Sequence, residues 1–142
     1  MSKIVYDTGY DTNAVEQAAI ATAEGLQKLL NDKAAAGFRK VVLLPGTYRV
    51  SAFRKVVLPD ALTLDLNGAT LKENAFTGCH SVIVALENVN DAHLVNGTLE
   101  GDYYEHDYKN SEKNSEWPMG FHIDGDTSYC WVENVTVRDI MG

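Results

Sequence analysis

Val95-Asn96-Gly97-Thr98-Leu99 is the most informative segment for the fold, because two other segments of the chain repeat it with small changes. Each copy has Asn before a short apolar run that contains Thr. A strand-and-turn unit that recurs in this way is typical of a solenoid, in which successive coils stack on one another. The other two copies are Leu66-Asn67-Gly68-Ala69-Thr70-Leu71 and Glu133-Asn134-Val135-Thr136-Val137.

A longer alignment extends the last two copies. Residues Val82 to Gly101 align with Gly120 to Asp139 at a constant offset of 38. Equivalent residues of stacked strands lie about 4.8 Å apart, so we predict that Asn134 lies over Asn96 and shares hydrogen bonds along the stack. The Asn-Gly pairs also favour hairpins, but a sandwich of hairpins does not explain why Asn and Thr return at matching places.

One helix precedes the strands. Apolar residues recur there with helical period, Asn13 and Glu16 have the spacing of a capping box, and Gly37 stops the pattern. The pattern predicts an amphipathic helix over residues 13–36. Its apolar stripe needs another part of the chain to cover.

The rest of the chain consists of short β-type runs separated by turn residues, without a second helix of convincing length. Ordinary βαβ units need a crossover of a dozen or more residues, so we expect the strands to stack in parallel through short turns. We predict an N-terminal segment with a capping helix over residues 1–37 and the first coils over residues 38–142. The expected strands are Lys40–Leu44, Tyr48–Val50, Lys55–Leu58, Leu62–Leu66, Ala69–Lys72, Val82–Leu86, His93–Val95, Thr98–Glu100, Phe121–Ile123, Trp131–Val132 and Thr136–Ile140.

Composition limits the classes of partner. The chain has 142 residues, 45% of them hydrophobic and 23% charged, which is ordinary for one folded domain. Its 20 acidic and 12 basic residues give a net charge of -8, which opposes binding to nucleic acid or to an anionic membrane surface. No apolar stretch approaches the roughly 20 residues of a membrane span, and no cleavable signal peptide is visible. We therefore expect neither a nucleic-acid partner nor membrane insertion.

Several motifs resemble the N-terminal part of the pectate-lyase-like superfamily of right-handed parallel β-helices. They are the helix, the run Val41 to Val50 with its Pro45-Gly46-Thr47-Tyr48 core, and the three Asn-containing copies. The resemblance implies a right-handed, single-stranded parallel β-helix with an N-terminal capping helix. It does not imply one activity, because the superfamily includes polysaccharide lyases, glycoside hydrolases, epimerases and bacteriophage tail spikes.

A further resemblance involves Gly101-Asp102, His106-Asp107-Tyr108, Glu116-Trp117 and Gly120, which are similar to a segment of β-helix proteins from phages and prophages of Gram-positive bacteria. It implies a tail-spike or appendage module of a virion that contacts bacterial-surface polysaccharide. Such proteins are often trimers, so we expect a homo-oligomer. The alternatives are the N-terminal part of a secreted or extracellular polysaccharide lyase or glycoside hydrolase, and a purely structural module.

The long offset between the last two copies indicates an inserted loop, because a coil needs little more than roughly 20 residues. The excess maps to residues 102–120, and long loops on a rigid scaffold often carry function. Aromatic faces stack on sugar rings, and carboxylates accept hydrogen bonds from sugar hydroxyls. In the alternative, Trp117 and one or two tyrosines fold back over the side of the coils. The candidates for carbohydrate binding are Tyr103, Tyr104, His106, Tyr108, Glu116 and Trp117.

The same loop holds oxygen and imidazole donors that could converge on Ca²⁺, although no EF-hand spacing is present. The donors are Asp102, His106, Asp107 and Glu116. We expect no cofactor, with Ca²⁺ as the remaining candidate.

Two acid pairs, Asp124 with Asp126 and Glu100 with Asp102, have the alternation that places side chains on one face of a strand. Glycoside hydrolysis needs two carboxyl groups held across the scissile bond. These four acids are candidate catalytic residues, but any solvated strand end has the same spacing, and no complete catalytic motif is present. Arg138 is a lone basic candidate. We interpret three histidines near the strands as turn or surface residues, namely His80, His93 and His122.

The last residues follow directly on an apolar strand, whereas a solenoid needs a cap at its end. We therefore expect that the chain is a piece of a longer protein, or that an oligomer or partner covers Val135 to Met141.

Overall fold

The computed structural model of the protein describes residues 6–7, 16–51, 54–75, 80–106, 109 and 117–140, with the backbone alone for residues 6, 7, 16–21 and 117. The described part is mostly β, with a curled parallel sheet and the helix α1 (Glu16–Ala35). The strands are β1 (Tyr6–Asp7), β2 (Lys40–Leu43), β3 (Thr47–Val50), β4 (Val56–Val57), β5 (Thr63–Asp65), β6 (Thr70–Glu73), β7 (His80–Glu87), β8 (His93–Glu100), β9 (Trp117–Asp124) and β10 (Trp131–Arg138).

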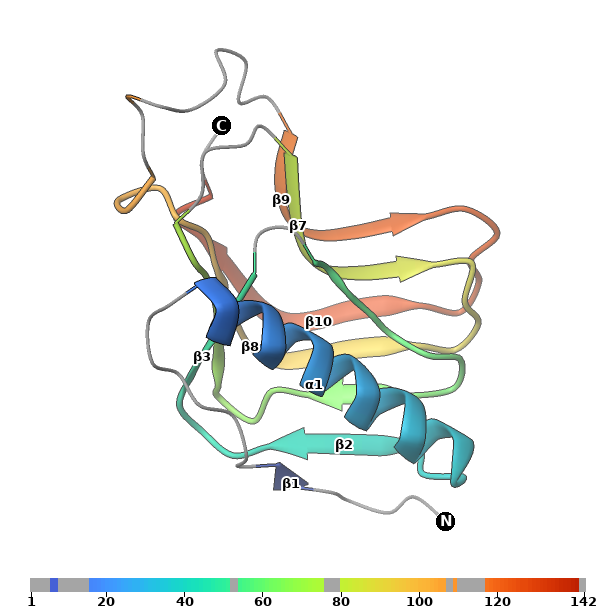
Figure 1. Ribbon diagram of the computed structural model, residues 1–142. Coiled ribbons are helices and arrows are strands. Elements are labelled where there is room, and N and C mark those ends of the chain that lie inside the picture. Colours follow the sequence, from blue (N-terminus) through green and yellow to red (C-terminus); the bar gives the residue numbers. More distant parts are fainter. Residues whose placement is uncertain are drawn as a thin grey trace.

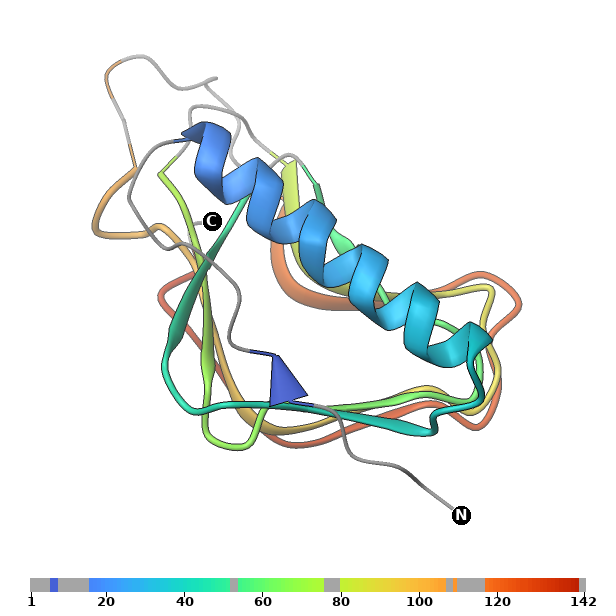
Figure 2. The same cartoon turned by 60° about the horizontal axis from the view of Figure 1, so that its bottom comes forward.

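The strands pair in three parallel ladders. The first contains β1, β2, β5 and the first halves of β8 and β10, and the second contains β3, β6 and the second halves of β8 and β10. The third contains β4, β7 and β9. All these pairings within the described residues are parallel, which confirms the prediction of parallel stacking over a sandwich of hairpins. Figure 1 shows the strands stacked, and Figure 2 shows the outline that they enclose.

Asparagines form the bend between the first two ladders. Asn96 in β8 and Asn134 in β10 both have a left-handed backbone, with φ of 64° and 54°. Asn tolerates this conformation better than most residues with a side chain. The Asn134 Nδ2 donates a hydrogen bond to the Asn96 Oδ1 at 3.0 Å, which confirms that Asn134 lies over Asn96.

The helix α1 covers the β1–β2 end of the stack, where it crosses in front of the outline in Figure 2. It contacts β3 and β4. Its buried side chains Ala23, Leu26 and Leu30 belong to the apolar stripe expected from the sequence. The helix is therefore confirmed over Glu16–Ala35, whereas the predicted cap at Asn13 lies outside the described residues.

The constant offset of 38 is wrong for half of the aligned segment. β8 and β10 do pair at 38, but β7 and β9 pair at 37, so that Phe121 lies over Val84 and Ile123 over Leu86. The additional residue lies in the turn after β9, where Gly125 has a φ of 72°. Because side chains alternate along a strand, this shift by one residue exchanges the two faces of β9 relative to the sequence alignment.

Candidate functional site

The segment after β8 is a tight turn anchored by two buried side chains. The backbone N–H groups of Glu105 and His106 both donate to the carbonyl of Asp102, at 2.8 and 2.7 Å. The side chains of Asp102 and His106 have no exposed surface, and the Asp102 Oδ2 lies 2.6 Å from the His106 Nδ1. Asp102 and His106 are two of the predicted site residues, and their buried side chains therefore fix the turn in place.

Ion pairs hold the same turn from outside. The Glu105 carboxylate lies 2.9 Å from the Arg49 guanidinium and 3.1 Å from the Lys72 ammonium. These two cations come from β3 and β6, so the turn is attached to two strands of the second ladder. The hydrogen bond from Arg49 lowers the pKa of the Glu105 carboxyl.

Two tyrosines project from this anchored turn. Tyr103 is 47% exposed and Tyr104 is 80% exposed, and their ring centroids lie 5.0 Å apart in an edge-to-face arrangement. Their exposure does not support the alternative in which these rings cover the side of the strands. The turn thus presents two exposed aromatic rings on a backbone that hydrogen bonds and ion pairs hold in place.

The predicted loop ends earlier than expected. Trp117 is the first residue of β9 and pairs with His80 of β7, so residues 117–120 belong to a strand. The backbone pairing with β7 continues to this point, and Pro118 is tolerated because β9 lies at the edge of its sheet. The other predicted loop residues, Asp107, Tyr108 and Glu116, lie outside the described residues.

A buried acid that the sequence analysis missed lies at the end of β6. Glu73 is almost completely buried, and the Ser81 hydroxyl donates to its Oε1 at 3.1 Å. Burial raises the pKa of Glu73 to about 8, and the charge of Asp102 adds to the rise. The sequence did indicate this burial, because Glu73 lies two residues after Leu71 and therefore on the same inward face of β6.

The acids predicted as catalytic pairs make different contacts. Glu100 pairs with Lys72 and Arg138, whereas Asp102 is buried against His106. Asp124 is the exposed last residue of β9, where its Oδ1 accepts from the Gly125 N–H, and Asp126 is exposed in the turn that follows. Among the described residues, no group of three or more His, Cys, Asp or Glu side chains could hold a metal ion.

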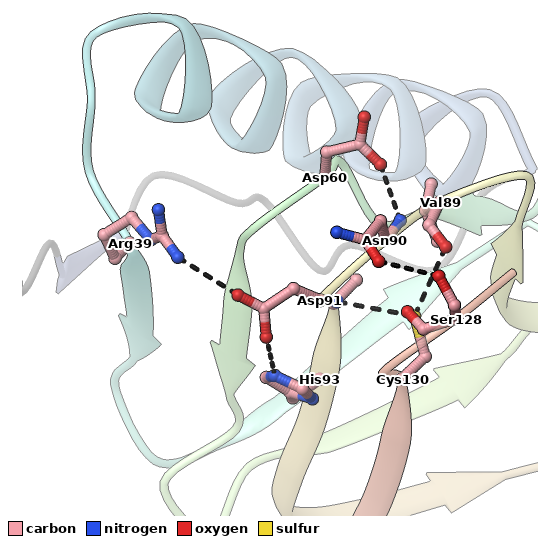
Figure 3. Close-up of polar contacts among 9 residues, drawn as sticks. Arg39, Asp60, Val89, Asn90, Asp91, His93, Ser128 and Cys130 are labelled. Carbon is pink, nitrogen blue, oxygen red and sulfur yellow. Dashed lines mark hydrogen bonds and ion pairs between the residues drawn. The ribbon is translucent and has the colours of Figure 1, made fainter.

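The bend between the third and first ladders is held by polar contacts within the chain (Figure 3). The Asp60 Oδ1 accepts from the Asn90 N–H at 2.7 Å, and the Asn90 Oδ1 accepts from the Ser128 hydroxyl at 2.7 Å. Asp91 bridges Arg39 at 3.1 Å and His93 at 2.7 Å. These side chains connect three successive turns and so fix the register of the stack.

The expectation that all three histidines are turn or surface residues is wrong for His93. Its ring is buried at the start of β8 and stacks on Trp131, with the ring centroids 3.6 Å apart. The two residues are paired across β8 and β10, so the indole excludes solvent from the imidazole. His80 is exposed, and His122 lies 3.7 Å from the Glu87 carboxylate.

A polar groove runs along the other bend, across the three Asn-containing copies. Its volume is about 390 Å³, and its lining has amide and hydroxyl side chains but no charged residue. From the sequence alone, only a scaffold role is expected for these residues. The recurrence of Asn and Thr in the sequence was the one indication of this groove. Recurrence alone could not show that the side chains line a common groove. The lining residues are Asn67, Gly68, Asn96, Gly97, Thr98, Asn134 and Thr136.

Comparison of the chain with protein-family models, with curated proteins and with solved structures found no match. Within the described residues, no helix is long and apolar enough to cross a membrane.

Proposed function

We propose that this chain is a right-handed parallel β-helix module, related to the pectate-lyase-like superfamily, of a bacteriophage tail spike or appendage that binds bacterial-surface polysaccharide. The three parallel ladders, the helix over one end and the left-handed asparagines at the bend support the proposed fold. The resemblance of the sequence to phage β-helix proteins supports the proposed context, a virion.

The anchored tyrosine pair is the observation that carries the binding function. Tyr103 and Tyr104 expose their rings on a turn that Asp102 and His106 fix from inside and Glu105 fixes from outside. A sugar ring stacks on an aromatic face, and its hydroxyls bond to nearby polar groups. Since the turn is already ordered, binding loses less conformational entropy than it would with a free loop.

The alternative of a polysaccharide lyase or hydrolase receives less support from the described residues. Glu100 and Asp102 have separate partners, and Asp124 and Asp126 are exposed at the end of β9 and in the turn after it. Glycoside hydrolysis requires two carboxyl groups held across the scissile bond, and the contacts of these four acids do not bring either predicted pair together in that way. We therefore propose binding as the function of this module.

Retention on isolated bacterial cell-wall glycans tests the proposal. Tyr104→Ala is expected to weaken retention about tenfold, because an aromatic contact contributes on the order of 1 kcal/mol in addition to the area that it buries. Tyr129→Asn is the matched control, since Tyr129 is also exposed but lies at a different bend. Equal retention of Tyr104→Ala and the wild-type chain would contradict the assignment of the tyrosine pair.

A further inference from the structure

The groove along the Asn bend is built from stacked rows of equivalent side chains. Thr47, Thr70, Thr98 and Thr136 are paired in register across β3, β6, β8 and β10. Their hydroxyls therefore recur at the strand spacing of about 4.8 Å. Thr98 and Thr136 line the groove beside Asn96 and Asn134, so its wall has a regular polar repeat parallel to the stacking direction.

Much of the hydrogen-bonding capacity of this wall is not used within the described part of the chain. The Asn67 and Asn134 side chains each donate through Nδ2, to the Leu43 carbonyl and the Asn96 Oδ1, but their Oδ1 atoms accept no bond there. The hydroxyls of Thr98 and Thr136 likewise make no hydrogen bond with described residues. A hydroxyl offers one donor and two acceptor positions. The bend in Figure 3 differs, because its polar side chains bond to one another.

The lining of the groove offers no charged group to a ligand. No charged side chain lines the groove, and on the adjacent outer row the Glu100 carboxylate pairs with Lys72 and with Arg138. The chain as a whole carries a net charge of -8, which repels anionic polymers. The lining of this groove therefore favours a ligand that is recognised through neutral hydrogen bonds. The volume of about 390 Å³ falls within the range of ligand sites, about 300 to 1,000 Å³.

We infer that the groove is a second carbohydrate subsite, which binds a neutral polysaccharide chain laid along the stacking direction. The chain's repeating hydroxyls bond to the hydroxyls of Thr98 and Thr136 and to the Oδ1 of Asn134. This inference rests on the proposed function, because it names the class of polysaccharide and a second place of contact. It is distinct from the tyrosine pair, which lies in the turn beyond the far end of β8.

The double variant Thr98→Val and Thr136→Val tests the subsite. Valine keeps the shape and the strand preference of threonine while it removes the hydroxyl. Thr47→Val is the matched control, because Thr47 is an exposed member of the same row outside the groove. Binding is measured by affinity electrophoresis in neutral polysaccharide isolated from bacterial cell walls and in polygalacturonate. The double variant is expected to bind the neutral polymer about tenfold more weakly, as the loss of two hydrogen bonds implies.

The possible outcomes separate the two proposals. Normal binding of Thr47→Val, weakened binding of the double variant and no retardation by polygalacturonate support the subsite. If Tyr104→Ala is impaired but the double variant binds normally, the subsite is wrong and the proposed function stands. Preference for polygalacturonate over the neutral polymer also overturns the subsite. If the wild-type chain binds no cell-wall glycan, both proposals are wrong. Circular dichroism of each variant confirms that the fold is unchanged.

Discussion

The bends of this chain depend on single residues that adopt a left-handed backbone. Asn96 and Asn134 occupy one bend, whereas Ala61, Asp91 and Tyr129 have the same conformation at the bend between the third and first ladders. A residue with a β-carbon loses roughly 1 to 2 kcal/mol in this conformation, and Asn loses less. The protein is therefore not optimised at every bend.

Tyr129→Asn is expected to raise the free energy of unfolding by about 1 kcal/mol, because Asn tolerates the φ of 55° better than Tyr. The Tyr129 ring is exposed, so little apolar burial is lost. Urea denaturation measures the change. A variant less stable than the wild-type chain would show that the ring makes a stabilising contact.

Glu73 gives the protein a predicted dependence on pH. Its pKa is about 8 in the folded state and near the ordinary 4.5 in the unfolded state, so the folded state holds the proton more tightly. The free energy of unfolding therefore falls as pH rises from about 4.5 to about 8 and changes little beyond that. Each unit of pKa difference corresponds to about 1.4 kcal/mol, so the loss amounts to several kcal/mol.

Glu73→Gln removes this dependence, because the amide remains neutral at every pH in the range. Urea denaturation between pH 5 and pH 9 is expected to give a flatter curve for the variant than for the wild-type chain. Glu133→Gln, at an exposed position of β10, serves as the control and should leave the slope unchanged. Parallel curves for Glu73→Gln and the wild-type chain would show that Glu73 is ionised in the folded state.

At the scale of the elements, β8 joins two strands that the sequence analysis had separated. His93–Val95 and Thr98–Glu100 were expected as two strands, but the structure continues through Asn96 and Gly97 as one bent strand. The Asn-Gly pair indicated the position of the bend correctly. Its tightness depends on Leu66, the residue after β5, because a β-carbon at Gly97 would lie 2.3 Å from the Leu66 Cβ.

Gly97→Ala is consequently expected to destabilise the protein by about 2 kcal/mol or more, since overpacking of a rigid site costs typically 1 to 3 kcal/mol. Gly68→Ala is the matched comparison: Gly68 has a φ of 83°, but its added β-carbon meets no atom within 4 Å. The Gly68→Ala variant should lose only about 1 kcal/mol of the free energy of unfolding, because only the backbone conformation is unfavourable. Denaturation curves of the two variants compare these costs, and equal losses would contradict the close approach to Leu66.

At the scale of the whole molecule, the columns of interior side chains continue onto β9 and β10 without a covering layer among the described residues. Phe121 lies over Val84, Ile123 over Leu86 and Val137 over Leu99. Their exposed fractions are 36%, 45% and 40%. Exposed apolar groups next to strand edges favour association with another chain, and the homo-oligomer expected from the resemblance stays a prediction.

We predict that Ile123→Lys combined with Val137→Lys shifts the protein toward the monomer. Lysine at a strand edge opposes association. Light scattering coupled to size exclusion measures the mass of each species. Thr63→Lys combined with Thr70→Lys introduces the same charge outside the interior columns, on the central strands β5 and β6, and should leave the mass unchanged. A wild-type chain that is monomeric at all concentrations tested would contradict the proposed oligomer.

Much of the fold was predictable from local patterns, but the candidate sites were less so. The helix and the positions of most strands followed from apolar periodicity and turn residues, and the stacking of Asn134 on Asn96 followed from the repeat. The offset of β9, the end of the insertion at Trp117 and the burial of His93 did not follow. Each depends on how segments pair across the stack, and a repeat alignment does not reveal one extra residue in a turn.

The parallel stack and the Asn bend follow from the sequence alone, because equivalent residues of successive turns must pack on one another and therefore share their chemistry. Which polar residues are exposed and which are buried, in contrast, depends on tertiary contacts. It placed Asp102 and His106 inside, left Tyr103 and Tyr104 outside, and gathered the Asn and Thr side chains of three distant segments around one groove. Burial and register depend on residues that are neighbours in space. Around the groove, the paired residues of β6, β8 and β10 lie 28 to 38 positions apart along the chain.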